Sequence, residues 1–378
     1  MHAARRTFPG LNALRFFAAY LVLMHHAEQI RAKSGFFNLK RYAIFNCGGP
    51  AVSFFFVLSG FLITHLLMVE LQTTNRLNVV KFYVRRALRI WPLYFLIVAI
   101  GLFVLPMAVQ ELHLNYRMPY RAKDVLALFL IFAPFIVNLR YEAHPLEPLW
   151  SIGVEEVFYL AWAPLFSLFR RRVLLLLSVV IALKIVLLAS AEYFAWMPEA
   201  SKLFRMLQFE AMAFGGLGAV WLRAHGDRPF PRLLFSRTSQ GVLLALLMSD
   251  LTARVMLSEH VPGYGFAFGN SWLAPWVRLA LFLWLILNVS ANPETILRLG
   301  SPVLNRLGEI SYGIYMYQML VATGVALVLR SWLTRFDAWS GTVIFYGLST
   351  GGTIAVAELS KRWFEDPFLR YKERFRAE

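Results

Sequence analysis

Long apolar runs recur along almost the whole chain, and they constrain its fold more than any other feature. About 20 mostly apolar residues in a helix cross the hydrocarbon core of a bilayer. A helix is expected because it pairs its own backbone N–H and C=O groups where water is absent. About ten spans are therefore predicted, at residues 11–30, 48–71, 88–108, 149–169, 172–193, 204–223, 239–257, 272–290, 308–329 and 339–361.

Composition agrees with a membrane protein and argues against a nucleic-acid-binding one. Apolar residues make up 58% of the chain and charged residues 16%, and the mean hydropathy of +0.56 lies well above that of soluble domains. The net charge is +16, but the basic residues lie between apolar runs, where membrane topology explains them. A single cysteine, Cys47, excludes an intrachain disulfide. Because membrane topology explains the basic residues, we expect no nucleic-acid partner. No histidine spacing fits a metal motif, so we expect no metal site.

Two basic segments set the predicted orientation. Residues 76–89 carry five Lys or Arg and residues 170–172 carry three arginines, so the positive-inside rule places both segments in the cytoplasm. An even number of crossings must then separate them, although three apolar runs lie between. We therefore expect the short run 124–139, which Pro134 interrupts, to be re-entrant or interfacial. Residues 1–378 are predicted to form one all-α integral membrane domain with both termini cytoplasmic and no separate soluble domain.

The first predicted span carries ionisable groups, which are costly in hydrocarbon and indicate a functional site. Arg15 and His26 are eleven residues apart, about three helical turns, so they share one face at depths about 16 Å apart. His25 points about 80° away from that face. We therefore expect His26, rather than His25, to take part in chemistry.

Two adjacent glutamates lie near the start of the 149–169 run. Glu155 and Glu156 point about 100° apart on a helix, and Glu155 shares its face with Ser151, so we expect Glu155 to face inward. A carboxylate beside an imidazole can fix its tautomer and stabilise its charged form, as general-base catalysis requires. The alternative is a structural ion pair of Glu155 with Arg140 or Arg278.

Three arginines gather just before the Trp91-Pro92 pair. Arg85, Arg86 and Arg89 are three and four residues apart along a predicted helix, which brings their side chains toward one side. Forked guanidinium donors that stay charged suit phosphate or pyrophosphate. The alternative is a plain basic flank that sets topology.

A further acidic residue lies inside the predicted span 204–223. Glu210 is followed by Gly215, Gly216 and Gly218, and glycines let neighbouring helices approach closely. We therefore retain Glu210 as a site candidate, together with Ser151 and Glu156.

Several segments, in order along the chain, resemble the membrane-bound acyltransferase 3 family, bacterial proteins that acylate carbohydrates and other envelope acceptors. The resemblance extends from about Leu11 to Trp363. It rests on Leu14-Arg15 followed by His26, and on residues 52–63, 82–94, 149–159 and 309–315.

The resemblance implies transfer of an acyl group, often acetyl, from cytoplasmic acyl-CoA to a hydroxyl group at or beyond the membrane. It implies His26 as the catalytic histidine, Arg15 as its companion, and Arg86 with Arg89 as the pair that binds the CoA phosphates, with Arg85 beside them. No tightly bound cofactor is expected, since acyl-CoA is a substrate.

The chain departs from the family pattern at two positions. Ser53 stands where many members have an acid, and Gln318 stands where many have histidine.

The prediction is therefore an acyl-CoA-dependent O-acyltransferase of the bacterial cytoplasmic (inner) membrane. Its acceptor is predicted to be a carbohydrate, a glycolipid or another envelope molecule, and its oligomeric state stays open. His26 acts as general base or briefly carries the acyl group, and Glu155 orients it. The alternative is a secondary transporter or exporter in which His, Glu and Arg form a proton relay. An apparent lack of inverted repeats and the arginine cluster favour the enzyme.

Overall fold

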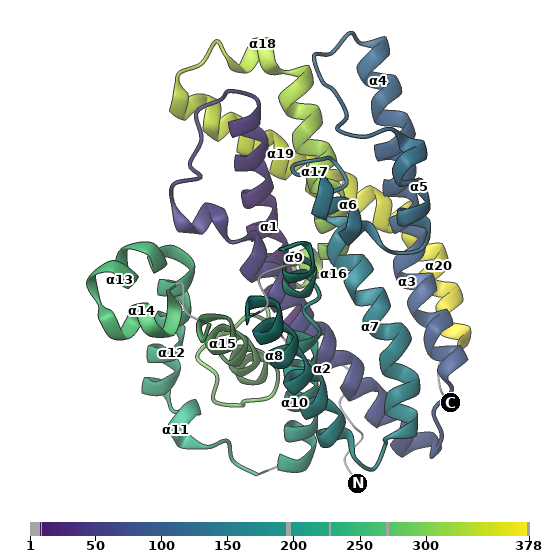
Figure 1. Cartoon of the computed structure of the whole chain (residues 1–378), viewed down its shortest axis with the longest axis vertical. Coiled ribbons are helices and arrows are strands. Elements are labelled where there is room, and N and C mark those ends of the chain that lie inside the picture. The colour runs from purple at the N-terminus through teal and green to yellow at the C-terminus, as the bar shows by residue number, and fades with distance from the viewer. Residues whose placement is uncertain (1–7, 9, 194–197, 227, 270–271, 376–378) are drawn as a thin grey trace.

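The computed structural model describes residues 8, 10–193, 198–226, 228–269 and 272–375, and every regular element in them is helical (Figure 1). The predicted all-α fold class is confirmed for these residues. The longer helices are α1 (Leu11–Lys33), α2 (Gly48–Thr74), α3 (Val79–Ala99), α5 (Ala122–Leu130), α7 (Leu149–Leu168), α8 (Val173–Tyr193), α9 (Pro198–Met206), α10 (Phe209–His225), α12 (Arg237–Thr252), α15 (Ala274–Ser290), α16 (Pro302–Glu309), α17 (Ser311–Val328) and α19 (Ala338–Ser360).

Shorter helices connect or extend these. They are α4 (Leu105–Glu111), α6 (Pro134–Arg140), α11 (Arg232–Phe235), α13 (Arg254–His260), α14 (Pro262–Phe268), α18 (Arg330–Leu333) and α20 (Asp366–Lys372). Single turns of π-helix, η2 (Ile100–Val104) and η3 (Lys361–Glu365), join α3 to α4 and α19 to α20. Two 3-10 turns complete the set, η1 (Ala43–Asn46) and η4 (Glu373–Phe375).

Five helical segments of the described chain are long and apolar enough to cross a membrane, so the count of about ten spans is not confirmed. Polar side chains such as Arg15 and His26 lower the hydropathy of α1. The predicted spans 204–223 and 239–257 are each divided by a break in the helix, after α9 and after α12. The five segments are Gly48–Thr74, Val79–Glu111, Val173–Ala191, Ser311–Val328 and Ala338–Phe375.

The short run 124–139 forms two helices rather than one. α5 has nine residues and α6 has seven, whereas about 20 are needed to cross a bilayer. The break falls just before Pro134, and Phe132 within it has a left-handed backbone with φ of 55°. This run therefore makes no single helical crossing.

Side-chain caps fix where several helices begin. The Asn78 side chain accepts a hydrogen bond from the backbone of Lys81 at the start of α3. Ser236 caps α12 in the same way, and Asp337 caps α19. Such caps satisfy backbone N–H groups that have no partner within the helix.

Glycine lets α2 and α10 pack backbone to backbone. A Cβ atom at Gly60 would overlap the Met212 carbonyl group, and one at Gly215 would overlap the Val57 carbonyl group. Small residues at such crossings are typical of membrane helix pairs. The predicted role of Gly215 in close helix contact is confirmed.

The helices form two groups that meet near the middle of the molecule. In Figure 1, α17, α19 and most of α1 occupy the upper half, and α2, α7 and α10 occupy the lower half. α1 contacts α2 below and α17 beside it, and α3 contacts both α7 and α17. The beginnings of α1, α7 and α17 and the middle of α2 line one cavity together with α3, and this junction holds the site.

Candidate active site

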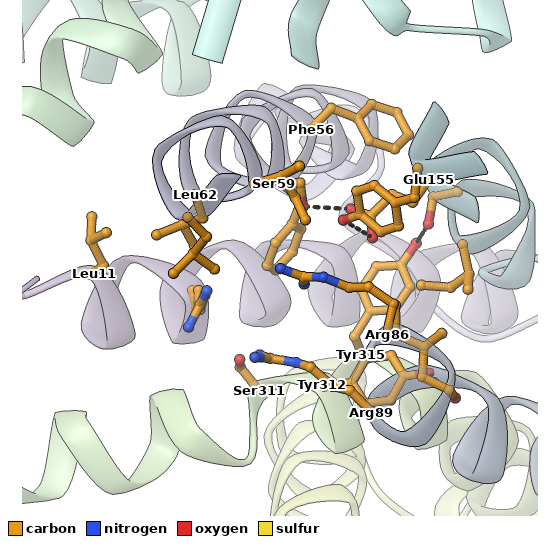
Figure 2. Close-up of a pocket in the computed structure, with 18 of the residues that line it drawn as sticks. Leu11, Phe56, Ser59, Leu62, Arg86, Arg89, Glu155, Ser311, Tyr312 and Tyr315 are labelled. Carbon is orange, nitrogen blue, oxygen red and sulfur yellow. Dashed lines mark hydrogen bonds between the residues drawn. The ribbon is translucent and has the colours of Figure 1, made fainter. Parts of the chain in front are cut away.

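A cavity of about 330 Å³ lies at the junction of α1, α2, α3, α7 and α17, a size typical of small-ligand sites. Three arginines line it, Arg15 from α1 and Arg86 and Arg89 from α3. Figure 2 shows the side chains of Arg86 and Arg89 extending in the same direction. Arg86 and Arg89 lie three residues apart on α3, so one helix face carries both guanidinium groups.

The guanidinium groups of this cavity have unused donors. Within the described chain, neither Arg86 nor Arg89 has a hydrogen bond or ion pair. Arg86 packs over the rings of Phe82 and Tyr159, with its Cζ atom 5.7 and 5.4 Å from their centroids. These cation–π contacts hold the side chain in place and leave its N–H groups available for an anion.

Glu155 supplies a carboxylate in the cavity wall. Ser59 donates a hydrogen bond to Glu155 Oε1 at 2.8 Å, and Tyr159 donates one to Oε2 at 3.2 Å; Figure 2 marks these contacts with dashed lines. The predicted inward orientation of Glu155 agrees with this placement. Among the described lining residues three arginines face this one glutamate, so the cavity favours a ligand that carries negative charge.

Arg85 lies outside the cavity, although the sequence grouped it with Arg86 and Arg89. Its guanidinium contacts Glu70 at 2.6 Å and donates to the Phe375 carbonyl at 2.9 Å. Adjacent helix positions differ by about 100°, which directs Arg85 away from the face of its neighbour. Arg85 therefore joins the start of α3 to the end of α2 and to the C-terminal segment.

Glu156 and Glu210 also make contacts between helices rather than line the cavity. Glu156 Oε2 accepts a hydrogen bond from the Trp91 indole at 2.9 Å, which links α7 to α3. Glu210 pairs with Lys184 at 3.0 Å, which links α10 to α8.

The predicted alternative partner of Glu155 is engaged elsewhere. Arg278 binds both carboxylate oxygens of Asp250, at 2.6 and 2.9 Å. The proposed ion pair between Glu155 and Arg278 is therefore wrong.

A hydrogen-bonded pair lines the cavity near the beginnings of α7 and α17, which we call its inner end. The Ser151 hydroxyl lies 2.7 Å from the Tyr315 hydroxyl, which also lies 3.0 Å from the Pro148 carbonyl. Both side chains are buried and both line the cavity. Tyr315 lies on α17, one turn before Gln318.

His26 does not line the cavity, but its ring contacts Gln318, one turn beyond Tyr315 on α17. The His26 side chain is 6% exposed, and Nδ1 lies 2.7 Å from the amide nitrogen of Gln318, which is 1% exposed. The predicted contact of Glu155 with His26 is not formed, because Ser59 and Tyr159 engage the carboxylate instead. Sequence reasoning noted Gln318 as a departure from a pattern and missed it as the ring's partner.

Fold and site together define a class: a multi-pass membrane protein whose helices enclose an arginine-lined cavity beside a buried histidine. The chain belongs to the acyltransferase 3 family, since the family model described as an acyltransferase domain matches residues 8–358.

Relatives with curated names share about a quarter of their residues with this chain. The peptidoglycan O-acetyltransferase OatA of Listeria monocytogenes is 25% identical over 99% of this chain and 58% of its own length. Nodulation protein 10 of Rhizobium leguminosarum bv. viciae is 25% identical over 96% of this chain and 94% of its own length. The O-acetyltransferase OatA of Staphylococcus aureus is 27% identical over 41% of this chain and 24% of its own length. No solved structure matches the chain.

Proposed function

We propose that this protein is an O-acyltransferase that moves an acetyl group from acetyl-CoA to a hydroxyl group of an envelope carbohydrate. The observation that carries the proposal is the cavity in which Arg86 and Arg89 keep unused donors beside a buried histidine. The relatives named as O-acetyltransferases, one of them acting on peptidoglycan, support the acetyl group and the carbohydrate acceptor.

The donor enters from the end of the molecule where α3 begins. Arg89 is exposed and Arg86 is partly buried, so an anion meets one and then the other. This end carries the basic segment 76–89, which by the positive-inside rule is expected on the cytoplasmic side of the bacterial inner membrane. Arg86 and Arg89 bind the CoA phosphates through forked donors, and the pantetheine arm extends inward along apolar side chains such as Phe55 and Leu62.

The thioester then reaches the inner end of the cavity, where Ser151 and Tyr315 separate it from His26. Breaking their 2.7 Å contact joins the cavity to the space around the histidine. Arg15 lies on the same helix as His26, about 16 Å nearer the entrance, and adds positive charge along the donor's path.

His26 acts as general base on the acceptor hydroxyl. The proton leaves the hydroxyl for His26 Nε2, the oxygen attacks the thioester carbonyl, the C–S bond breaks, and the proton passes on to the CoA thiolate. In a second route, His26 Nε2 attacks the thioester carbonyl and the C–S bond breaks to release the CoA thiolate. The acceptor hydroxyl then attacks the acetyl group on His26, the N–C bond breaks, and the hydroxyl proton passes to the thiolate.

Gln318 orients the imidazole for this step. For Nε2 to accept a proton, Nδ1 must already carry one, and Nδ1 then donates to the Gln318 side-chain oxygen after a half-turn of the amide group. Amide nitrogen and oxygen positions are assigned from the hydrogen-bond network, so both orientations fit one side-chain position. The role first assigned to Glu155 thus passes to Gln318.

A proton-relay transporter has less support. Glu155 and His26 bind different partners, so the described residues contain no direct hydrogen bond from this carboxylate to the imidazole. A relay needs such neighbours to hand on a proton.

Binding and turnover in lipid nanodiscs test the proposal. The purified protein should bind acetyl-CoA, and the double variant Arg86→Ala/Arg89→Ala should bind it at least about 100-fold more weakly, because two charge-assisted contacts are lost. Arg171→Ala, which removes an exposed arginine of the same predicted cytoplasmic side, should bind like the wild type. If the double variant bound acetyl-CoA as tightly as the wild type, the arginine cluster would serve only to set membrane topology.

A further inference from the structure

A second group of polar side chains lies beyond His26 along α1, on the side away from Arg15. Gln29 lies one turn farther along α1, and Glu147 immediately precedes Pro148 and α7. Gln29 donates to Glu147 Oε1 at 3.4 Å, and the His25 ring lies 5.3 Å from the His26 ring. With Gln318 on α17, these residues form a cluster from three separate segments.

Each of these neighbours carries a buried polar atom with no hydrogen-bond partner in the described chain. The atoms are His25 Nδ1, Gln29 Oε1, Glu147 Oε2 and Gln318 Oε1. Burying a polar atom without a partner is unfavourable, so such atoms are usually satisfied in a folded protein. Gln318 and His25 contact His26, and Gln29 contacts Glu147, so unpartnered atoms from three segments lie along one path and indicate a missing polar ligand.

Two other buried polar groups close to the cluster are fully paired. His144 uses both ring nitrogens, with Tyr120 at 3.0 Å on one side and Asn138 at 3.0 Å on the other. Glu28, on the same helix as Gln29, accepts from Arg31, Tyr346 and the Leu39 backbone. The same region therefore satisfies its structural groups and leaves those beside His26 without partners.

The chemistry of the unpartnered atoms identifies the ligand. The Gln29 and Glu147 oxygens are hydrogen-bond acceptors, and the Gln318 amide, once turned to accept from His26 Nδ1, offers an N–H donor. The cluster therefore matches a ligand with hydroxyl groups, which both donate and accept. An anion would be repelled by the Glu147 carboxylate. A metal cation is disfavoured by basic neighbours, since Lys33 donates to the Ala143 carbonyl in the same loop at 3.0 Å.

Access to the cluster is graded. His25, Gln29 and Glu147 are partly exposed, whereas Gln318 is 1% exposed at the inner end. A ligand therefore enters past Gln29 and Glu147 and stops at Gln318 and His26. This approach lies toward the far end of α1, opposite the entrance to the donor cavity.

We propose that Gln29, Glu147 and Gln318 form an acceptor subsite that binds neighbouring hydroxyl groups of a saccharide and presents one of them to His26. This proposal rests on the proposed function, because it gives His26 the hydroxyl whose proton it removes. Donor and acceptor then reach the histidine from opposite ends of the molecule, and neither has to displace the other.

The test compares acceptor and donor kinetics in nanodiscs. Release of CoA from acetyl-CoA is followed at increasing concentrations of glycerol, N-acetylglucosamine and its disaccharide with N-acetylmuramic acid. Gln29→Leu and Glu147→Gln should each raise the KM for the best saccharide at least about fivefold, since each removes a hydrogen-bond acceptor. Their affinity for acetyl-CoA should equal that of the wild type, which also shows that the variants are folded.

A matched control and the contrary outcomes complete the experiment. Glu142→Gln changes an exposed glutamate in the same loop and should leave the saccharide KM unchanged. An unchanged saccharide KM in both subsite variants would overturn the proposal. The proposal would also be overturned if the wild-type protein bound acetyl-CoA but released CoA no faster with any hydroxyl compound of the series. Failure to bind acetyl-CoA at all would instead count against the proposed function.

Discussion

The arginines at the two ends of the molecule differ in what surrounds them. Arg31, in the half of α1 beyond His26, is 2% exposed and lies 2.6 Å from Glu28, which is fully buried. Arg31 also donates to Thr342 and packs on two aromatic rings of α19. At the opposite end, Arg86 and Arg89 face a cavity with no hydrogen-bond partner in the described chain.

The difference separates structural charges from functional ones. A buried charge is tolerated when its partner and donors are in place, and then it joins helices. A charge that keeps free donors toward a cavity is instead arranged for a ligand. Arg278 with Asp250 and Lys184 with Glu210 belong to the first kind, and the cavity arginines belong to the second.

Removal of His26 is the strongest test of the proposed functional site. His26→Ala should slow acetyl transfer by about 100-fold to 10,000-fold, the usual contribution of a general base. The acetyl-CoA affinity should change little, because the phosphate-binding arginines remain. Transfer rates and acetyl-CoA titrations on the same preparation measure both. Full activity in a folded His26→Ala protein would remove the histidine from the mechanism.

Removal of Arg31 is the strongest test of the structural role assigned to paired buried charges. Arg31→Leu leaves Glu28 buried and uncompensated, which should lower the free energy of unfolding by about 3–5 kcal/mol. The double variant Glu28→Leu/Arg31→Leu should recover much of this loss, because no isolated charge remains. Thermal unfolding in detergent measures both. A stability equal to the wild type in Arg31→Leu would break the comparison.

Arg86→Ala should show the opposite pattern. Acetyl-CoA affinity should fall about tenfold, equivalent to about 1.4 kcal/mol, while the melting temperature stays the same or rises, since an unpaired charge is removed. The matched variant is Arg85→Ala, which breaks the contact with Glu70 and should lower stability without changing the affinity of the folded protein. An affinity loss in Arg85→Ala rather than in Arg86→Ala would reverse the assignment of the two neighbours.

Helix faces could be read from the sequence, whereas contact partners could not. Spacing along one helix correctly oriented Glu155 inward and grouped Arg86 with Arg89. The Ser59 hydroxyl that binds Glu155 comes from α2, 96 residues earlier, and the sequence contains no signal for that pairing. The short range of helical periodicity explains this limit, since it relates residues within a few turns and not across the bundle.

The same limit explains why the sequence does not identify Gln318 as the neighbour of His26. A carboxylate such as Glu155 can fix the tautomer of an imidazole, whereas Gln318 lies 292 residues from His26 in sequence. The arginine grouping failed at Arg85 for a related reason. Its position on α3 was predicted, but Glu70 and the Phe375 carbonyl lie on other segments.

His144 predicts a pH dependence of stability. Burial lowers the pKa of His144 from 6.5 to about 3, so the folded protein keeps this ring neutral while the unfolded chain protonates it. Stability should therefore fall as pH drops below about 6.5 and continue to fall toward pH 3. At pH 5 the free energy of unfolding should be about 2 kcal/mol lower than at pH 7, since one pKa unit corresponds to about 1.36 kcal/mol.

Melting temperatures at pH 7 and pH 5 measure this loss. His144→Gln weakens the contacts with Tyr120 and Asn138 and removes the buried titrating ring, so the variant should be less stable at pH 7 and should lose less stability on acidification. An equal pH slope in the variant would assign the effect to other groups.

Gln318 gives the smallest effect and the sharpest distinction, because it touches the histidine and not the donor cavity. Gln318→Leu should slow transfer by about tenfold or less, the scale of one neutral hydrogen bond, since His26 keeps its position but loses control of its tautomer. Gln318→Glu can only accept from Nδ1 when ionised, so it should hold the base-competent tautomer and raise the imidazole pKa through its charge. The pH–rate profile should then shift toward higher pH, while Gln318→Leu changes the rate without that shift. A purely structural role for Gln318 predicts the reverse, equal rate losses in both variants with the same pH profile, because both would act only through packing.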